Sequence, residues 1–197
     1  METPRSRSGF GKAGLALAVI AGILLLGDLN QRMSDARRLE GDARSLQTEV
    51  AGMEALAARL ATQVDLARAV IADGRPLLGI CLGHQIVARA AGAETRRLRF
   101  GHHGANHPVQ DLELGRVQVT AQNHEVQVVG ESVRAASGFH VSQVNLNDGS
   151  VEGLRHATLP IETVQYHPEG APGPLDALAV FDRFVARASE RASERAR

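Results

Sequence analysis

Aromatic side chains and cysteines are scarce in this sequence. Its 197 residues include one cysteine, one tyrosine and no tryptophan, and aromatic residues make up 3% of the chain. A single cysteine excludes an internal disulfide framework, and a lone thiol fits a reducing compartment. Because aromatic side chains usually fill much of a large core, their scarcity indicates that part of the chain is not globular.

An excess of charge and a phosphate-binding loop are also missing. The formal net charge is zero, with 22 basic and 22 acidic side chains, so bulk electrostatics do not indicate a nucleic-acid or anionic-surface binder. The sequence contains no glycine-rich phosphate loop and therefore no visible ATP site. With 44% hydrophobic residues, the chain could bury one core or form one domain with an extension.

The first third begins with a basic segment, residues 1–12, followed by the uncharged run AGLALAVIAGILLLG at residues 13–27. As a helix this run spans roughly 22 Å, whereas a bilayer core is about 30 Å thick, and extension to residues 10–29 closes the gap. We therefore predict a single-pass membrane anchor at residues 13–29. A cleaved signal peptide and a buried helix remain alternatives.

Residues 30–63 carry a heptad pattern. Every seventh position holds Leu39, Leu46, Met53 and Leu60, and a companion line of alanine and valine runs three residues before it. This pattern predicts a left-handed coiled coil, although an amphipathic helix packed on the following domain would also fit. Because the companion line is mostly alanine, self-association is expected to be weak. An anchor that leads directly into a coiled coil resembles the septum formation initiator family of bacterial division proteins.

The only cysteine, Cys81, lies in the stretch RPLLGICLGHQIVARA. The apolar run before it, Leu77 to Ile80, is typical of a parallel strand that is buried on both faces, and the residues after it favour a helix. A nucleophile between a buried strand and a helix forms a nucleophile elbow, which exposes the side chain. The helix dipole is expected to lower the thiol pKa. An inert buried cysteine is the alternative.

A histidine and a glutamate follow a strand-like run near the end of the chain, in IETVQYHPEG. A thiolate nucleophile needs a base, and that base needs an acceptor to orient it. His167 and Glu169 alternate with Pro168 in an extended segment, so both side chains can point the same way. On its own, such a pair is more often an ordinary surface pair.

Five stretches of the sequence resemble the class I glutamine amidotransferases, in particular the small-subunit type of carbamoyl-phosphate synthetase. They are GICLGHQ, LRFGHHGANHPV, VTAQNHE, VNLNDGSVEGLRH and VQYHPEGAPGPLDA, within roughly residues 64–187. The resemblance implies a partial flavodoxin-like α/β domain that hydrolyses glutamine to glutamate and ammonia without a cofactor. The partner that it implies is a large synthetase subunit, which uses the ammonia to make carbamoyl phosphate for arginine and pyrimidines.

The resemblance also implies roles for individual residues. Cys81 would form the γ-glutamyl thioester, His167 would act as acid and base, and Glu169 would orient His167. The substrate-binding positions would be Leu82, whose backbone N–H is an oxyanion donor, together with Gln85, Asn123, Glu125 and Val126.

Three histidines, His102, His103 and His107, cluster in the stretch GHHGANH. Such a cluster can indicate a metal site. No cysteine or carboxylate accompanies them in this stretch, and the resemblance implies that the stretch is a loop of the family. We therefore predict no metal ligand here.

The sequence departs from the family pattern in two places. The strand–helix units that precede the elbow in the family are missing, including a Gly-Gly-Pro-Gly-Asp-Pro loop that supplies a second oxyanion donor. The stretch NHEV stands where the family has Asn-His-Gly-Phe, so Glu125 adds a carboxylate near the substrate and Val126 removes an aromatic wall. Glutaminase activity is therefore expected to be impaired.

The expected membrane topology conflicts with this function. Basic residues before the anchor favour a cytoplasmic N-terminus, which would leave the amidotransferase region outside, whereas a functional one belongs in the cytoplasm. A fusion of two gene fragments would produce this conflict. The alternative function is a membrane-anchored coiled-coil scaffold of the division type with an inactive amidotransferase passenger.

The expected segments are 1–12 (basic), 13–29 (anchor), 30–63 (coiled coil), 64–187 (truncated amidotransferase domain) and 188–197 (charged tail, helical or disordered).

Overall fold

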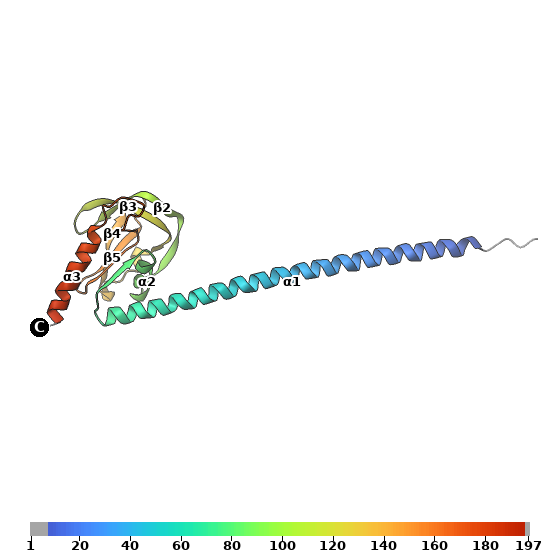
Figure 1. The fold of residues 1–197 in the computed structure, drawn as a ribbon, viewed down its shortest axis with the longest axis horizontal. Helices are drawn as coiled ribbons and strands as arrows, with labels where there is room; N and C mark the ends of the chain where they lie inside the picture. The colour runs from blue at the N-terminus through green and yellow to red at the C-terminus, as the bar shows by residue number, and fades with distance from the viewer. Residues whose placement is uncertain (1–7, 196–197) are drawn as a thin grey trace, which may run out of the picture. The chain divides into compact units, whose positions relative to one another are not determined.

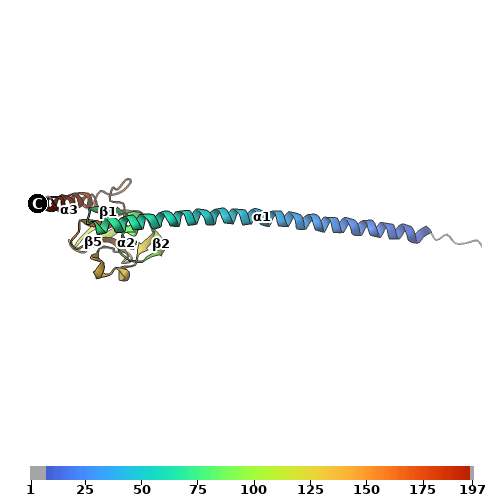
Figure 2. The same ribbon diagram turned by 90° about the horizontal axis from the view of Figure 1, so that it is seen from below.

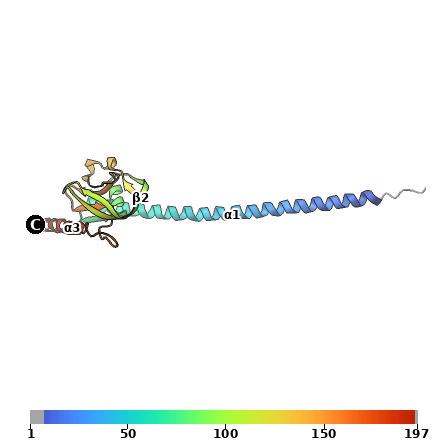
Figure 3. The same ribbon diagram turned by 90° about the horizontal axis from the view of Figure 1, so that it is seen from above.

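The computed structural model describes residues 8–195, and the chain divides into two compact units between Ala57 and Ala58. The first helix, α1 (Ser8–Ala72), is a single helix of 65 residues that continues across this boundary. It is unbroken in all three views (Figures 1, 2 and 3). The predicted basic segment falls partly on residues 1–7, which lie outside the described residues.

The predicted membrane anchor is not supported. Within residues 8–195, no helix has an apolar stretch long enough to cross a bilayer. The uncharged run ends at Gly27, and Asp28 then forms an ion pair with Arg32 at 2.8 Å on the next turn. Charged side chains therefore begin inside the segment that would have to reach the second interface. The prediction of a single-pass membrane protein is wrong.

In the first unit, the leucine line of the heptad is exposed to solvent. Leu39, Leu46 and Met53 have exposed fractions of 68%, 61% and 63%. No other part of the unit covers them, because the unit consists of one helix in the residues that the structure describes. This stretch of α1 therefore presents unburied apolar area.

The second unit is built on one six-stranded sheet in the order β1-β6-β5-β3-β2-β4, with an additional pairing of β5 with β4 (Figure 1). The pairing of β1 with β6 is parallel, and the other pairings are antiparallel. The sheet is therefore mixed, whereas a flavodoxin-like sheet is parallel. The strands are β1 (Leu77–Ile80), β2 (Thr95–Asp111), β3 (Arg116–Val128), β4 (Phe139–Asn145), β5 (Val151–His156) and β6 (Ile161–Val164).

Two helices cover opposite faces of the sheet, α2 (Leu82–Ala90) on one and α3 (Ala179–Arg195) on the other (Figure 1). Short 3-10 turns occur at Gly130–Ser132 and Ala135–Ser137. The apolar run before Cys81 and the residues after it form β1 and α2, as the sequence predicts. The described part of the charged tail forms the end of α3.

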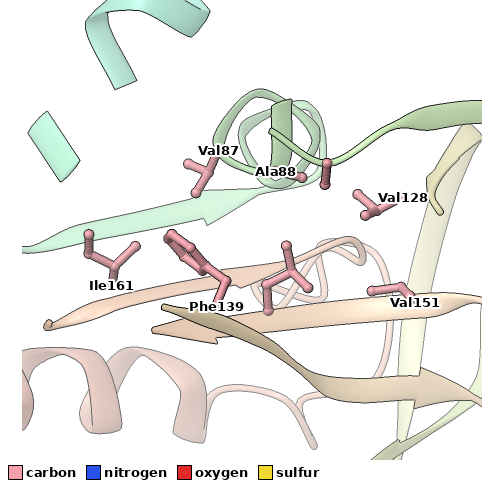
Figure 4. Close-up of a cluster of buried hydrophobic side chains, with 8 residues drawn as sticks. Val87, Ala88, Val128, Phe139, Val151 and Ile161 are labelled. Atoms are coloured by element: carbon pink, nitrogen blue, oxygen red, sulfur yellow. The ribbon is translucent and has the colours of Figure 1, made fainter. Parts of the chain in front are cut away.

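The core has one layer on each face of the sheet. On the α2 side, Val87 and Ala88 pack with strand residues that include Phe139 and Ile161 (Figure 4). On the α3 side, Val180 packs with the buried residues Val109, Val164, Tyr166 and Ala177. The short strand β1 contributes to both layers because its side chains alternate, with Leu77 in the first and Leu78 and Ile80 in the second.

Ion pairs attach α3 to the sheet. The carboxylate of Glu162 on β6 is almost fully buried, and it accepts hydrogen bonds from Arg183 of α3 and, at 3.2 Å, from Arg155 of β5. Asp111 of β2 lies 3.7 Å from the Arg183 guanidinium. A buried carboxylate is tolerated only where cations and hydrogen bonds replace its water. The helix is therefore fixed by charge as well as by Val180.

Replacement of Arg183 tests this attachment. We expect Arg183→Met to lower the free energy of unfolding by about 2 kcal/mol or more, because Glu162 loses one of its two cationic partners in a buried position. Chemical denaturation of the two proteins measures the difference. Arg68→Met is the matched control, because Arg68 forms an exposed pair with Asp65 and its loss should change stability by less than about 0.5 kcal/mol. Equal effects of the two variants would contradict the assignment.

Candidate active site

The parallel pairing of β1 with β6 brings the predicted catalytic residues to one edge of the sheet. Ile80, the last residue of β1, pairs with Val164, the last residue of β6. The backbone N–H of Cys81 donates to the carbonyl of Val164 at 2.9 Å, so Cys81 is level with Gln165. His167 and Glu169 follow on the same side, beyond the carboxyl end of β6. Such edges are where open α/β sheets bind ligands.

Cys81 occupies a strained turn between β1 and α2. Its backbone has φ 52° and ψ −106°, and no other non-glycine residue in residues 8–195 has a positive φ. Conformations of this kind cost about 1–3 kcal/mol and persist where the surrounding structure enforces them. A Cβ on Gly79 would lie 2.8 Å from the carbonyl oxygen of Gly83. Strand and helix therefore approach closely enough to force the turn, and Cys81 forms the nucleophile elbow.

The thiol of Cys81 is half-buried, and its pKa is raised above the ordinary value of 9.0. Burial is the main cause. The backbone N–H of Leu82 and the side chain of Gln165, whose Nε2 lies 3.8 Å from Sγ, act in the opposite direction, while the charges of Glu169 and Glu152 raise the pKa further. The sequence-based expectation of a lowered thiol pKa is therefore wrong, because desolvation outweighs the helix N-terminus.

His167 and Glu169 form a hydrogen-bonded pair. Nδ1 of His167 lies 2.8 Å from Oε1 of Glu169, and the backbone N–H of His167 donates to the carbonyl of Ala121 at 2.9 Å. Burial acts to raise the pKa of Glu169, but hydrogen bonds from its own backbone N–H and from His167 hold that pKa below its usual value. An ionised Glu169 therefore accepts from Nδ1–H, which leaves Nε2 of His167 free to exchange protons.

A cavity of about 470 Å³ lies beside this pair. It contains three of the predicted site residues, His167, Glu169 and Asn123, and its other walls come from β2, β3 and the loop after Glu169. Cys81, Leu82, Gln85, Glu125 and Val126 are not in its lining. The cavity lining comprises Gly104, Ala105, Ala121, Gln122, Asn123, His167, Glu169, Ala171 and Pro172.

The remaining predicted residues are engaged in contacts of their own. Nε2 of Gln85 lies 3.1 Å from the carbonyl of Val126 and 3.1 Å from Oε1 of Gln165, so it bridges α2, β3 and the segment after β6. Glu125 forms an ion pair with Arg97 at 2.5 Å. The carboxylate that departs from the family pattern is therefore charge-compensated.

Residues 52–187 match the family model described as Glutamine amidotransferase class-I. The chain belongs to the class I glutamine amidotransferase family. The match does not extend to residues 1–51, and the predicted resemblance of that part to septum formation initiators is not shown.

Curated relatives of this amidotransferase chain are carbamoyl phosphate synthase small chains. The small chain of Bacillus caldolyticus is 55% identical over 111 residues, and that of Thermus thermophilus is 53% identical over 110 residues. Each alignment covers 56% of this chain, but only 30% and 27% of the respective relative. The chain therefore spans less than a third of the length of these relatives.

A solved structure has a similar fold. The crystal structure of a candidate GMP synthase subunit from Thermoplasma acidophilum has a TM-score of 0.58, with 20% identity, and the match covers 68% of each chain. At this identity the likeness concerns the fold alone. Together with the family match, it confirms the prediction of a class I amidotransferase α/β domain that follows a long helix.

Two residues of the amidotransferase site were missed from the sequence, Gln165 and His84. Gln165 is fully buried and contacts the thiol. His84 of α2 is fully buried beside Thr163, with Nδ1 2.8 Å from Oγ1, and burial together with the nearby His124 lowers the pKa of His84 to about 3. A neutral His84 therefore fixes α2 to β6. The pairing of β1 with β6 places Gln165, so no local pattern could have identified it.

The reactivity of Cys81 should follow its raised pKa. Because the neutral thiol is favoured below the raised pKa, the alkylation rate of the folded chain should reach its midpoint at a higher pH than that of the unfolded chain. Iodoacetamide kinetics measure this directly, since the chain has one cysteine. Glu169→Gln should move the midpoint to lower pH because it removes a negative charge near Sγ. The chain unfolded in urea is the control, and a folded midpoint below the unfolded one would contradict the assignment.

Proposed function

We propose that the second unit hydrolyses glutamine to glutamate and ammonia through a thioester on Cys81. The observation that carries the proposal is the strained elbow at the carboxyl end of β1, level with the segment of β6 that leads to the His167–Glu169 pair. A nucleophile, a base with one free nitrogen and an acceptor that orients the base are the parts that thiol catalysis requires. The family membership and the small-chain relatives support the choice of glutamine.

In the first half of the reaction, Sγ of Cys81 attacks the carboxamide carbon of glutamine. Because burial favours the neutral thiol, Nε2 of His167 accepts the thiol proton as the S–C bond forms. The backbone N–H of Leu82 stabilises the oxyanion of the tetrahedral intermediate. The protonated His167 then gives its proton to the leaving nitrogen, and ammonia departs as the C–N bond breaks.

In the second half, water attacks the thioester while Nε2 of His167 accepts a proton from it. The C–S bond breaks, the proton returns to Sγ and glutamate leaves. Glu169 keeps its hydrogen bond to Nδ1–H throughout and stabilises the imidazolium, so it acts as a positioning residue for His167.

Glutamine would lie partly in the cavity beside His167, with Asn123 at its wall, and its carboxamide would extend beyond the cavity to Sγ of Cys81, which is not in the lining. Gln85 would contact the substrate only after its hydrogen bonds to Val126 and Gln165 rearrange. Glu125 would repel the substrate carboxylate less than its sequence position implies, because Arg97 is bound to it. The small-chain relatives support the further proposal that the ammonia passes to a large synthetase subunit.

Covalent labelling tests the proposal. A glutamine analogue with a diazoketone in place of the carboxamide should label Cys81, and excess glutamine should protect it. Glu169→Gln should slow labelling by ~10²-fold or more, because His167 loses the acceptor that orients it. Mass spectrometry locates the adduct.

Cys81→Ser should abolish the labelling, and Glu131→Gln, which alters an exposed carboxylate outside the cavity, is the matched control. Labelling that persists in Cys81→Ser, or that glutamine does not reduce, would overturn the proposal.

A second candidate function, self-association through α1, rests on the exposed heptad line. An unpaired amphipathic helix gains stability when its apolar seam is buried against a second copy. The line Leu39, Leu46 and Met53 is exposed in the described chain. We propose that this stretch forms a weak parallel dimer. Such self-association would be one component of a scaffold function.

Sedimentation of a peptide of residues 30–66 checks the dimer. We expect a monomer–dimer equilibrium at millimolar concentration with a helical circular dichroism signal. Leu46→Asn should weaken it because an amide enters the seam, whereas Thr48→Asn, on the outer face of the helix, should leave it unchanged. A monomer without helical signal at that concentration would exclude the dimer.

A further inference from the structure

Two histidines and one glutamate converge in the interior, behind the cavity. His102 of β2 and His124 of β3 are paired in the strand register, and Glu152 lies on β5. Each offers one ligand atom, and these atoms all lie within 4.8 Å of one another. The exposed fractions are 6%, 7% and 0%. Three buried side chains with metal-binding atoms therefore meet in the interior.

The nitrogen Nε2 of His124 is buried and has no hydrogen-bond partner among the described residues. Nδ1 of the same ring lies 2.9 Å from the carbonyl oxygen of Val126, which can only accept, so Nδ1 carries the hydrogen. Nε2 is then an unprotonated lone pair in the interior. Buried acceptors without a partner are rare in folded proteins, and each calls for an explanation such as a missing ion.

His102 is held in the same way. Its Nε2 lies 3.0 Å from Oδ2 of Asp148, and the carboxylate fixes the hydrogen on that nitrogen. The other nitrogen, Nδ1, faces Oε1 of Glu152 at 3.3 Å. In a neutral His102 these are two acceptors facing each other. Nδ2 of Asn145 lies 2.8 Å from Oε1 but 3.5 Å from Nδ1, so it satisfies the nitrogen only weakly, and a positive charge between the two acceptors would stabilise both. That charge is either a second proton on His102 or a cation.

One of the ligand-atom distances fits a metal ion of small radius, while all three ligand atoms lie within 4.8 Å of one another. Two ligands that each lie about 2.0–2.1 Å from a tetrahedral zinc ion are separated by about 3.3–3.4 Å, and Nδ1 of His102 and Oε1 of Glu152 are 3.3 Å apart. Imidazole ligands suit zinc and neighbouring transition metals, whereas magnesium and calcium prefer oxygen alone. Two histidines and a glutamate form an established ligand set for zinc, with water in the fourth position.

The groups around the three side chains orient them as a metal site requires. Metal-binding histidines usually donate their second N–H to a carbonyl or carboxylate, and here Val126 and Asp148 accept those hydrogens. The carboxylate of Glu152 accepts from Nε2 of Gln122 at 2.9 Å and from Nδ2 of Asn145 at 2.8 Å. These contacts fix the ligand atoms before any ion arrives.

We propose that His102, His124 and Glu152 bind one zinc ion that ties β2, β3 and β5 together behind the cavity. The prediction of no metal rested on the missing carboxylate in GHHGANH, but Glu152 comes from a distant strand. The second histidine also comes from a distant part of the sequence. His124 of β3 lies beside His102, whereas His103 and His107 of that stretch are not among the three ligands. Gln122 contacts Glu152 and lines the cavity. The ion would hold the cavity wall that carries Gln122 and Asn123.

Metal binding by the full chain, with any affinity tag removed, tests the proposal. After treatment with a chelator, the protein should take up one equivalent of Zn²⁺ in calorimetric titration, and its melting temperature should rise with the ion. His124→Asn and Glu152→Gln should each weaken binding by at least ~100-fold, since each removes a direct ligand. His140→Asn is the matched control, because His140 of β4 forms an exposed pair with Glu113.

Cobalt spectroscopy keeps the test decisive if the variants do not fold. The wild-type chain loaded with Co²⁺ should show the visible absorption of a tetrahedral site with nitrogen and oxygen ligands, and Zn²⁺ should displace it. Absence of stoichiometric uptake by the folded wild-type chain would overturn the proposal. Retained affinity in both ligand variants, or an equal loss in His140→Asn, would do the same.

Discussion

The parallel pairing of β1 with β6 joins two segments that are 84 residues apart at Cys81 and Gln165. Everything at the candidate site depends on it. It sets Cys81 level with Gln165, puts the His167–Glu169 pair beyond the same strand end, and gives α2 a fixed starting point. The antiparallel strands then supply the cavity wall. A shift of this register by one residue would turn alternate side chains to the wrong face and separate the thiol from its neighbours.

Two buried carboxylates in this domain are stabilised by different kinds of partner. Glu152 and Glu162 lie on neighbouring strands and are both almost fully buried. Glu162 is neutralised by two guanidinium groups, one of which belongs to α3. Glu152 has two amide donors and an imidazole, and thus less positive charge around it. The negative charge of Glu162 is compensated by its neighbours, whereas that of Glu152 is compensated only in part. Glu162 therefore stabilises the fold, while Glu152 is a candidate metal ligand.

Local patterns were enough to predict β1, α2 and the elbow at Cys81, because an apolar run, a glycine and a helical period are all contained in one short stretch. The His167–Glu169 pair was equally visible because its members are two residues apart. The thiol pKa was predicted in the wrong direction, since the burial of Sγ arises from packing that no local pattern contains. Gln165 and Glu152 were missed for the same reason. The prediction of an anchor at residues 13–29 was wrong because it gave more weight to the hydropathy of a short run than to the charged residues on either side of it.

The backbone of Cys81 has a further consequence. Glycine adopts a φ near 52° without the steric cost that any side chain incurs, so the fold alone would be better served by glycine at this position. Folding stability and chemistry therefore have opposite preferences at a single residue. The cysteine costs the domain some folding stability, and the close packing between β1 and the start of α2 holds its backbone in the strained conformation.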